Sequence, residues 1–113
     1  MNNTCYIPRT YLRHHRQLRA LLIGHEAWFS AQDLSRLLSC HFSARLPSML
    51  DADQSRREQL RDANGQFAEE LLLSESGVYH LLSVQFYHPE NRNLRQWLTH
   101  EVVADLRGMG QAA

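Results

Sequence analysis

The pair Asn64-Gly65 lies between two segments of strand-forming residues, and it is the feature that most restricts how this chain folds. Asn-Gly is the strongest short-range signal for a hairpin, because both residues tolerate the positive φ angles that tight turns require. The sequence therefore predicts a β-hairpin with Glu58–Asp62 and Phe67–Leu73 as its strands. Strands joined by so short a connection are antiparallel.

A second hairpin is predicted over residues 16–29. Apolar residues alternate with other residues before a turn at Gly24-His25-Glu26, and a short strand-forming run follows: Leu18, Ala20 and Leu22 come before the turn, and Ala27, Trp28 and Phe29 after it. Such alternation is typical of a strand. Residues 1–15 precede this hairpin as a basic N-terminal arm. We expect its first ten residues to be loose, although Tyr6, Ile7, Tyr11 and Leu12 allow part of the arm to dock.

The segment after the first hairpin has clear helix signals. Ser30 is a good N-cap and Asp33 follows three residues later, as in an acidic variant of the capping box. The spacing of Leu34, Leu37 and Leu38 gives this helix one apolar stripe, which fades at residues 39–41. Residues 43–50 form a further short helix only if Pro47 lies in its first turn.

Two longer helices follow the second hairpin. Ser74 caps the first of them, and Pro89 lies in the first turn of the other, where proline is favourable. The apolar face of the last helix comprises Leu94, Trp97, Leu98, Val102 and Leu106. We expect Trp28 and Trp97 to anchor the core, and Gly108 to end the last helix.

These elements occur in the order hairpin, helix, hairpin, helix, helix. The sequence therefore predicts an α+β fold of two antiparallel β-hairpins packed with three to four helices. The chain has 113 residues, which is the usual size of one domain. We place this domain at residues 16–110 and expect residues 111–113 to fray.

Charge is distributed unevenly along the chain. Twelve arginines balance twelve acidic residues, and there is no lysine. Residues 1–25 hold four arginines and no acid, whereas residues 51–75 hold seven acids and three arginines. The basic arm is suited to phosphate or to an acidic partner, and two solvated faces of opposite sign are the simpler alternative. A neutral total argues against strong nonspecific binding of nucleic acid.

Several functional classes lack their sequence signals. No apolar run approaches the roughly 20 residues of a membrane span, and the N-terminus lacks signal-peptide order, so we expect a cytoplasmic protein. The seven histidines show no metal-ligand spacing, and Cys5 and Cys40 are expected to be free, buried thiols. No phosphate-binding loop or catalytic motif is present, so we expect no cofactor, no metal and no enzymatic activity.

Three segments carry longer patterns. Residues 28–34 are Trp-Phe-Ser-Ala-Gln-Asp-Leu, residues 74–82 are Ser-Glu-Ser-Gly-Val-Tyr-His-Leu-Leu, and residues 94–107 contain Leu-Arg-Gln-Trp-Leu, Glu-Val-Val and Leu-Arg. In order and spacing they resemble three motifs of the Bro-N domain. The first segment resembles its opening, aromatic–Phe–x–Ala–x–Asp–Val/Leu, and the second resembles its Asn/Ser-Glu-x-Gly-Leu/Val-Tyr-x-Leu motif. The third is similar to its closing signature, Phe-x-x-Trp-Val-x-x-Glu-Val-Leu-Pro-x-Ile-Arg. That domain is found in baculovirus repeated-ORF proteins and in phage and prophage antirepressors.

The resemblance implies a small regulator of the phage or prophage type, with a DNA-binding module acting in transcription. The chain departs from the family at Cys40-His41-Phe42, where a Gly-Tyr is usual, and at Ala104, where a proline is usual. Residues 85–90 carry fewer basic residues than the family does. Most members also have a second domain after this one, so we expect a stand-alone regulator.

Six arginines are the candidate contacts to double-stranded DNA: Arg9, Arg13, Arg16 and Arg19 on or near the arm, and Arg36 and Arg45 beside the first helix. Arginine suits both phosphate and guanine because its planar guanidinium donates two hydrogen bonds at once. We expect a homodimer, because one neutral unit offers few phosphate contacts. The alternative is an antirepressor-like module that docks on a transcription factor or host protein through the acidic residues 51–75.

Overall fold

The structure is a computed structural model, and it describes residues 5–40, 42, 45–85 and 89–111. The strands are β1 (Cys5–Tyr6), β2 (Arg9–Arg13), β3 (Arg16–Ile23), β4 (Glu26–Ser30), β5 (Ser55–Arg61) and β6 (Phe67–Ser74). The helical segments are α1 (Ala31–Leu37), the 3-10 turn η1 (Leu46–Met49), α2 (Glu75–His80) with its continuation η2 (Leu81–Gln85), and the consecutive α3 (Asn91–Trp97), η3 (Leu98–Val103) and α4 (Ala104–Gln111).

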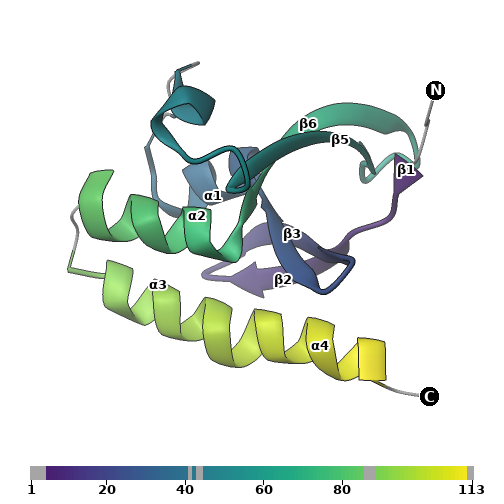
Figure 1. Ribbon diagram of the computed structural model, residues 1–113. Helices are drawn as coiled ribbons and strands as arrows, with labels where there is room; N and C mark the ends of the chain where they lie inside the picture. The colour runs from purple at the N-terminus through teal and green to yellow at the C-terminus, as the bar shows by residue number, and fades with distance from the viewer. Residues whose placement is uncertain (1–4, 41, 43–44, 86–88, 112–113) are drawn as a thin grey trace.

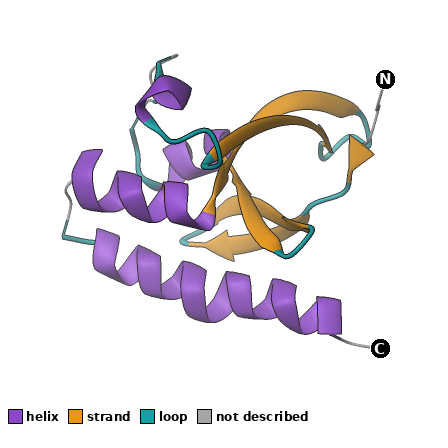
Figure 2. Cartoon of the chain, in the orientation of Figure 1, coloured by secondary structure: helices purple, strands orange, loops and turns teal. Residues whose placement is uncertain are grey.

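The six strands form one curled sheet in the order β1-β5-β6-β4-β3-β2. The helices α2–η2 and α3–η3–α4 lie side by side against one face of the sheet, whereas β5 and β6 arch away from them (Figures 1 and 2). The predicted α+β class, with two antiparallel hairpins and three helices, is therefore confirmed.

Both predicted hairpins form. In the first, Gly24 takes a φ of +65° in the turn between β3 and β4. In the second, β5 and β6 pair from Ser55 opposite Leu73 to Arg61 opposite Phe67. Gly65 has a φ of +82°, and Asp62 Oδ1 accepts the main-chain N–H of Asn64 at 2.9 Å and of Gln66 at 3.0 Å. The carboxylate of Asp62 thus holds the loop that the Asn64-Gly65 pair predicts.

The expectation that the first ten residues are loose is wrong for residues 5–10, the part of them that the structure describes. Arg9–Arg13 pairs along its whole length with β3, and Cys5–Tyr6 pairs in parallel with β5. Only Ile7 and Pro8 separate these two strands, which form opposite edges of the sheet. The segment therefore helps to curl the sheet toward closure, because Tyr6 packs against apolar residues inside the curl and Tyr11 packs against the main core.

The two predicted N-caps are confirmed. Ser30 Oγ accepts the N–H of Asp33 at 3.3 Å, and Ser74 Oγ accepts the N–H of Gly77 at 3.1 Å. Pro47 lies in the first turn of η1, the position in which a helix in residues 43–50 tolerates it. A Cβ at Gly77 would lie 2.7 Å from the main-chain oxygen of Gln54, so close packing requires glycine there.

The last helix differs from the prediction at its end. Gly108 does not stop it, because α4 continues to Gln111. A glycine inside a helix costs only about 1 kcal/mol, which hydrogen bonds on both sides can offset. Four residues of the predicted apolar face are buried, namely Leu94, Leu98, Val102 and Leu106. Trp97 packs against the main core but is only half-buried, so its predicted role as a core anchor holds in part, whereas Trp28 is buried as expected.

Apolar side chains gather on both faces of the sheet. The main core lies between the sheet and the helices and includes Leu18, Phe29 and Leu73. A smaller cluster lies inside the curl and comprises Leu21, Trp28, Leu60 and Leu72. Successive residues of β3 from Leu18 to Leu21 are therefore all buried, because each of its faces is covered.

Candidate functional site

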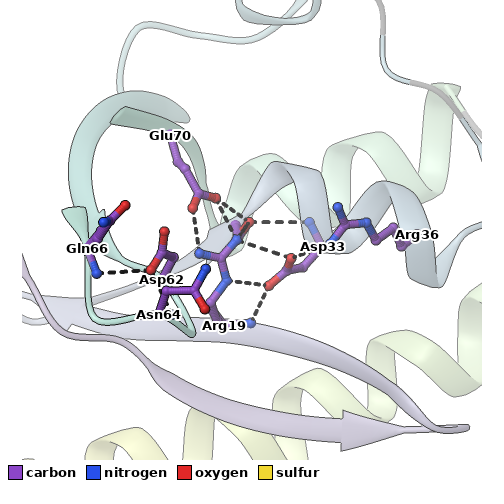
Figure 3. A network of polar contacts seen from close by, with 8 residues as sticks. Arg19, Asp33, Arg36, Asp62, Asn64, Gln66 and Glu70 are labelled. Carbon is purple, nitrogen blue, oxygen red and sulfur yellow. Dashed lines mark hydrogen bonds and ion pairs between the residues drawn. The ribbon is translucent and has the colours of Figure 1, made fainter. Parts of the chain in front are cut away.

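Arg19, a predicted DNA contact, is buried inside the curl of the sheet. Its main-chain N–H and its Nε donate to Oδ2 of Asp33 at 2.8 and 2.9 Å, and its Nη2 donates to Oε1 of Glu70 at 2.7 Å (Figure 3). Burial by itself would lower the pKa of Arg19, but the hydrogen bonds and charges of the two carboxylates outweigh it and raise the pKa. The prediction for Arg19 is wrong, because contact with DNA would break a buried ion pair.

The same network explains two carboxylates that face each other across a strand pair. Glu58 on β5 lies directly opposite Glu70 on β6, an arrangement that is unfavourable for like charges. Each has its own arginine, since Arg56 Nε donates to Glu58 at 2.6 Å and Arg19 binds Glu70. Glu70 is therefore part of the interior, whereas its neighbour Glu69 is exposed, as alternation along a strand requires.

Three other predicted DNA contacts lie close to one another at the surface. Arg13 and Arg16 flank the tight turn between β2 and β3, and Arg36 lies in the last turn of α1. A hollow of about 480 Å³, which we call the hairpin hollow, opens between this turn, the end of α1 and the start of α3. Its lining consists of Arg13, His14, Arg16, Leu37, Leu38, Ser39, Glu90, Asn91 and Leu94.

A more open hollow adjoins it and shares Arg16 and Ser39. Its other lining residues are Gln17, Ser35, Arg36 and Cys40, so it brings Arg36 to the same surface. Glu90 is the only carboxylate that lines either hollow in the described part of the chain. The side chains of Arg13, Arg16 and Arg36 therefore concentrate positive charge around the β2–β3 turn, and together with His14 and His15 of the turn we call them the basic surface.

Backbone strain is concentrated at this same place. Among the described residues, three other than glycine have a positive φ: His14 at +52°, His15 at +67° and Ser39 at +53°. The two histidines occupy turn positions that favour Asn-Gly, and Ser39 ends α1 where glycine is usual. Residues held in this region cost free energy and concentrate at functional sites, which marks the hairpin hollow as the candidate site.

The arginines of the basic surface also make contacts within the chain. Arg16 Nη1 donates to Ser39 Oγ at 2.9 Å and to the main-chain oxygen of Arg36, so it caps the C-terminal end of α1. The guanidinium of Arg13 lies over the ring of Trp97, with 5.5 Å between Cζ and the ring centroid. Both of these hydrogen bonds of Arg16 use Nη1, and the guanidinium of Arg13 donates no hydrogen bond to another described residue, so both side chains retain donors for an anion.

The remaining candidates are elsewhere. Arg9 forms an ion pair with Asp105 of α4, with 3.3 Å between Nε and Oδ2. The same carboxylate accepts a hydrogen bond from Tyr11 at 2.7 Å. The pKa of Tyr11 is raised to about 12, mainly because the side chain is partly buried and next because of this hydrogen bond. Arg45 is exposed just before η1 and lines neither hollow. The structure therefore brings together Arg13, Arg16 and Arg36, but not Arg9, Arg19 or Arg45.

The segment of residues 51–75 is less acidic at its surface than its composition predicts. The outward face of its hairpin carries Arg57 and Arg61, and Glu69 lies between them on the neighbouring strand. The acids inside the curl are paired with arginines, and Asp62 holds the turn. The exposed acids Asp51 and Asp53 are not accompanied by a broader acidic face on the strands.

Sequence reasoning missed Trp97 and Leu37 as residues beside the site. Both belong to apolar stripes, and each packs against the main core but is only half-buried. Spacing gives no signal of this, because an apolar position in a stripe looks the same in the sequence whether its side chain is fully or only partly covered. The expectation of buried thiols is also wrong: Cys5 is exposed and Cys40 is half-buried, although burial raises the pKa of the Cys40 thiol.

Two further observations concern metal ligands and membrane-spanning helices among the described residues. No three histidine, cysteine, aspartate or glutamate side chains among them are placed to hold a metal ion. Within the same ranges, every helix is too short or too polar to cross a membrane.

Comparison with protein-family models, curated proteins and solved structures found no match to this chain. The resemblance to the Bro-N domain therefore stays a prediction. The motif residues have structural roles in this chain: Ser30 and Ser74 cap helices, Asp33 binds Arg19, and Gly77 permits a close contact.

Proposed function

We propose that the protein is a DNA-binding regulatory module rather than an enzyme, and that it grips duplex DNA with its basic surface. The observation that carries this proposal is the convergence of Arg13, Arg16 and Arg36, which lie on three separate elements, around one turn. Guanidinium groups that retain free donors bind phosphate oxygens in pairs of hydrogen bonds. The resemblance to the Bro-N domain implies the same class of partner.

Local charge supports this proposal although the total charge is zero. Among the described residues, Glu90 lines the hairpin hollow and Asp33 lies 3.7 Å from Arg36, but Asp33 is already bound by Arg19. The surface therefore stays positive, and two copies in a homodimer would present twice as many arginines to one duplex. The antirepressor-like alternative has weaker support, because the outward face of the β5–β6 hairpin carries Arg57 and Arg61.

A salt titration tests the proposal. We expect the protein to bind a fluorescent duplex of about 20 base pairs, with an affinity that falls steeply as salt rises. The double variant Arg13→Gln/Arg16→Gln should bind more weakly and lower the salt slope by about 0.9 for each phosphate that is no longer neutralised.

The matched control is Arg57→Gln/Arg61→Gln, which removes the same charge from the outward face of β5. This control should bind duplex with an unchanged slope. An equal loss in both double variants would mean that only net charge matters. Absence of binding at low salt would contradict the proposal and favour the protein-binding alternative, and sedimentation with and without duplex would report whether two copies bind together.

A further inference from the structure

The hairpin hollow has a lining that DNA phosphates do not use. Leu37, Leu38 and Leu94 form an apolar wall, and the first two are only half-buried. A duplex contacts such a surface from outside through its phosphates and does not fill a hollow between a turn and two helices. The exposed apolar surface of these leucines is therefore left for a different, smaller partner.

The size of the hollow and its polar groups define that partner. A volume of about 480 Å³ lies within the roughly 300–1,000 Å³ that is usual for small-molecule sites. Arg13 and Arg16 stand on the hairpin side, whereas Glu90 lies at the start of α3. An anionic group is therefore favoured beside the two arginines, and the apolar part of a ligand is favoured beside the leucines, which sets the orientation of a ligand.

The site is also formed in advance. His14 and Ser39, which both line the hollow, are held at positive φ, and Arg16 links Ser39 to β3. Strained residues persist only where surrounding contacts fix them, so the lining does not have to assemble when a ligand arrives. Such preorganisation lowers the entropic cost of binding.

We propose that the hairpin hollow binds a small amphipathic anion, in which a phosphate or carboxylate is joined to an apolar ring. The anionic group lies between Arg13 and Arg16, and the ring packs on Leu37 and Leu38. This goes beyond the binding of DNA. Because the ligand and DNA share two arginines, the ligand should also compete with duplex, and this second consequence rests on the proposed function.

Thermal unfolding tests the proposal without DNA. Phenyl phosphate supplies a phosphate joined to an apolar ring and benzoate a carboxylate joined to the same ring, whereas inorganic phosphate and phenol each supply one half of the ligand. We expect one or both of the first two to raise Tm by about 5 °C at roughly ten times its Kd. Inorganic phosphate and phenol should bind at least about tenfold more weakly, and the proposal is overturned if either matches the complete ligand or if neither complete ligand shifts Tm.

Three variants locate the site, each compared with its own Tm in the absence of ligand. Arg13→Gln removes the anion contact and Leu37→Gln removes part of the apolar wall, so both should abolish the shift. Leu12→Gln is the matched control, because Leu12 is 72% exposed on the same hairpin and does not line the hollow. A shift that survives both of the first two variants, or that is abolished in the control, places the ligand elsewhere and overturns the proposal.

Displacement of labelled duplex by phenyl phosphate or benzoate separates the two proposals. A ligand-induced Tm shift in a protein that binds no duplex would leave this inference standing and contradict the proposed function. Duplex binding without a Tm shift from any ligand would overturn this inference alone.

Discussion

Arg16 and Arg19 lie three residues apart on β3 and occupy opposite environments. Arg16 is exposed beside the hairpin hollow, whereas Arg19 is 7% exposed and bound to Asp33 and Glu70 inside the curl. An odd separation along a strand directs the two side chains to opposite faces. An arginine-rich segment thus contains both buried, paired charges and charges exposed to solvent, and the carboxylates that face each arginine decide which it is.

The largest effect should come from breaking the interior network. Arg19→Met leaves Asp33 and Glu70 buried without their cation, and removal of one partner from a buried ion pair costs about 3–5 kcal/mol. Urea unfolding measures the loss in the free energy of unfolding. A loss below about 1 kcal/mol would mean that water reaches the curl and that Arg19 belongs with the surface arginines.

Arg16→Met should have a smaller effect, of about 1 kcal/mol. The variant removes the side-chain hydrogen bonds to Ser39 and to the main-chain oxygen of Arg36, and hydrogen bonds of this kind contribute roughly 0.5–1.5 kcal/mol each before exposure to water is considered. The same urea measurement applies, with Gln17→Met as a control on a neighbouring exposed position. A loss as large as that of Arg19→Met would erase the contrast between the two arginines.

Tyr11 tests the contact that ties β2 to the last helix. Its pKa is raised to about 12, so above pH 10 the unfolded chain loses this proton while the folded chain keeps it. The free energy of unfolding should therefore fall between pH 10 and 12, by less than about 1 kcal/mol because the side chain is partly solvated. Tyr11→Phe should make this fall smaller, and an unchanged pH profile would contradict the contact with Asp105.

Arg36→Gln should have the smallest effect on stability, below about 0.5 kcal/mol. Arg36 lies 3.7 Å from Asp33, but its side chain is 57% exposed and Arg19 already neutralises that carboxylate. Duplex affinity should fall in this variant while the urea midpoint hardly moves. A loss of stability above about 1 kcal/mol would join Arg36 to the interior network and remove it from the proposed DNA contacts.

Prediction succeeded where the physical cause is local. Asn64-Gly65 and Ser74 act through hydrogen bonds and φ angles within a few residues, so the hairpin and the helix start are readable from the chain itself. It failed for Cys5–Tyr6 and Arg9–Arg13, because their partners are supplied by β5 and β3. In the candidate site, the predicted contacts Arg13, Arg16 and Arg36 lie at the surface, as a DNA contact requires. No pattern in the sequence indicates that Leu37 and Ser39 line the hairpin hollow beside them.

The sequence by itself determined the α+β class, both long hairpins and the starts of two helices, because turns and caps are satisfied by neighbouring atoms. Only the tertiary structure decided which arginines are buried in ion pairs and which are exposed. Asp33 and Glu70 lie 14 and 51 residues from Arg19 along the chain, and they reach it because α1 and β6 are brought to the same side of β3. Electrostatic energy depends on distance in space and on burial, and neither is encoded in the spacing of residues along the chain.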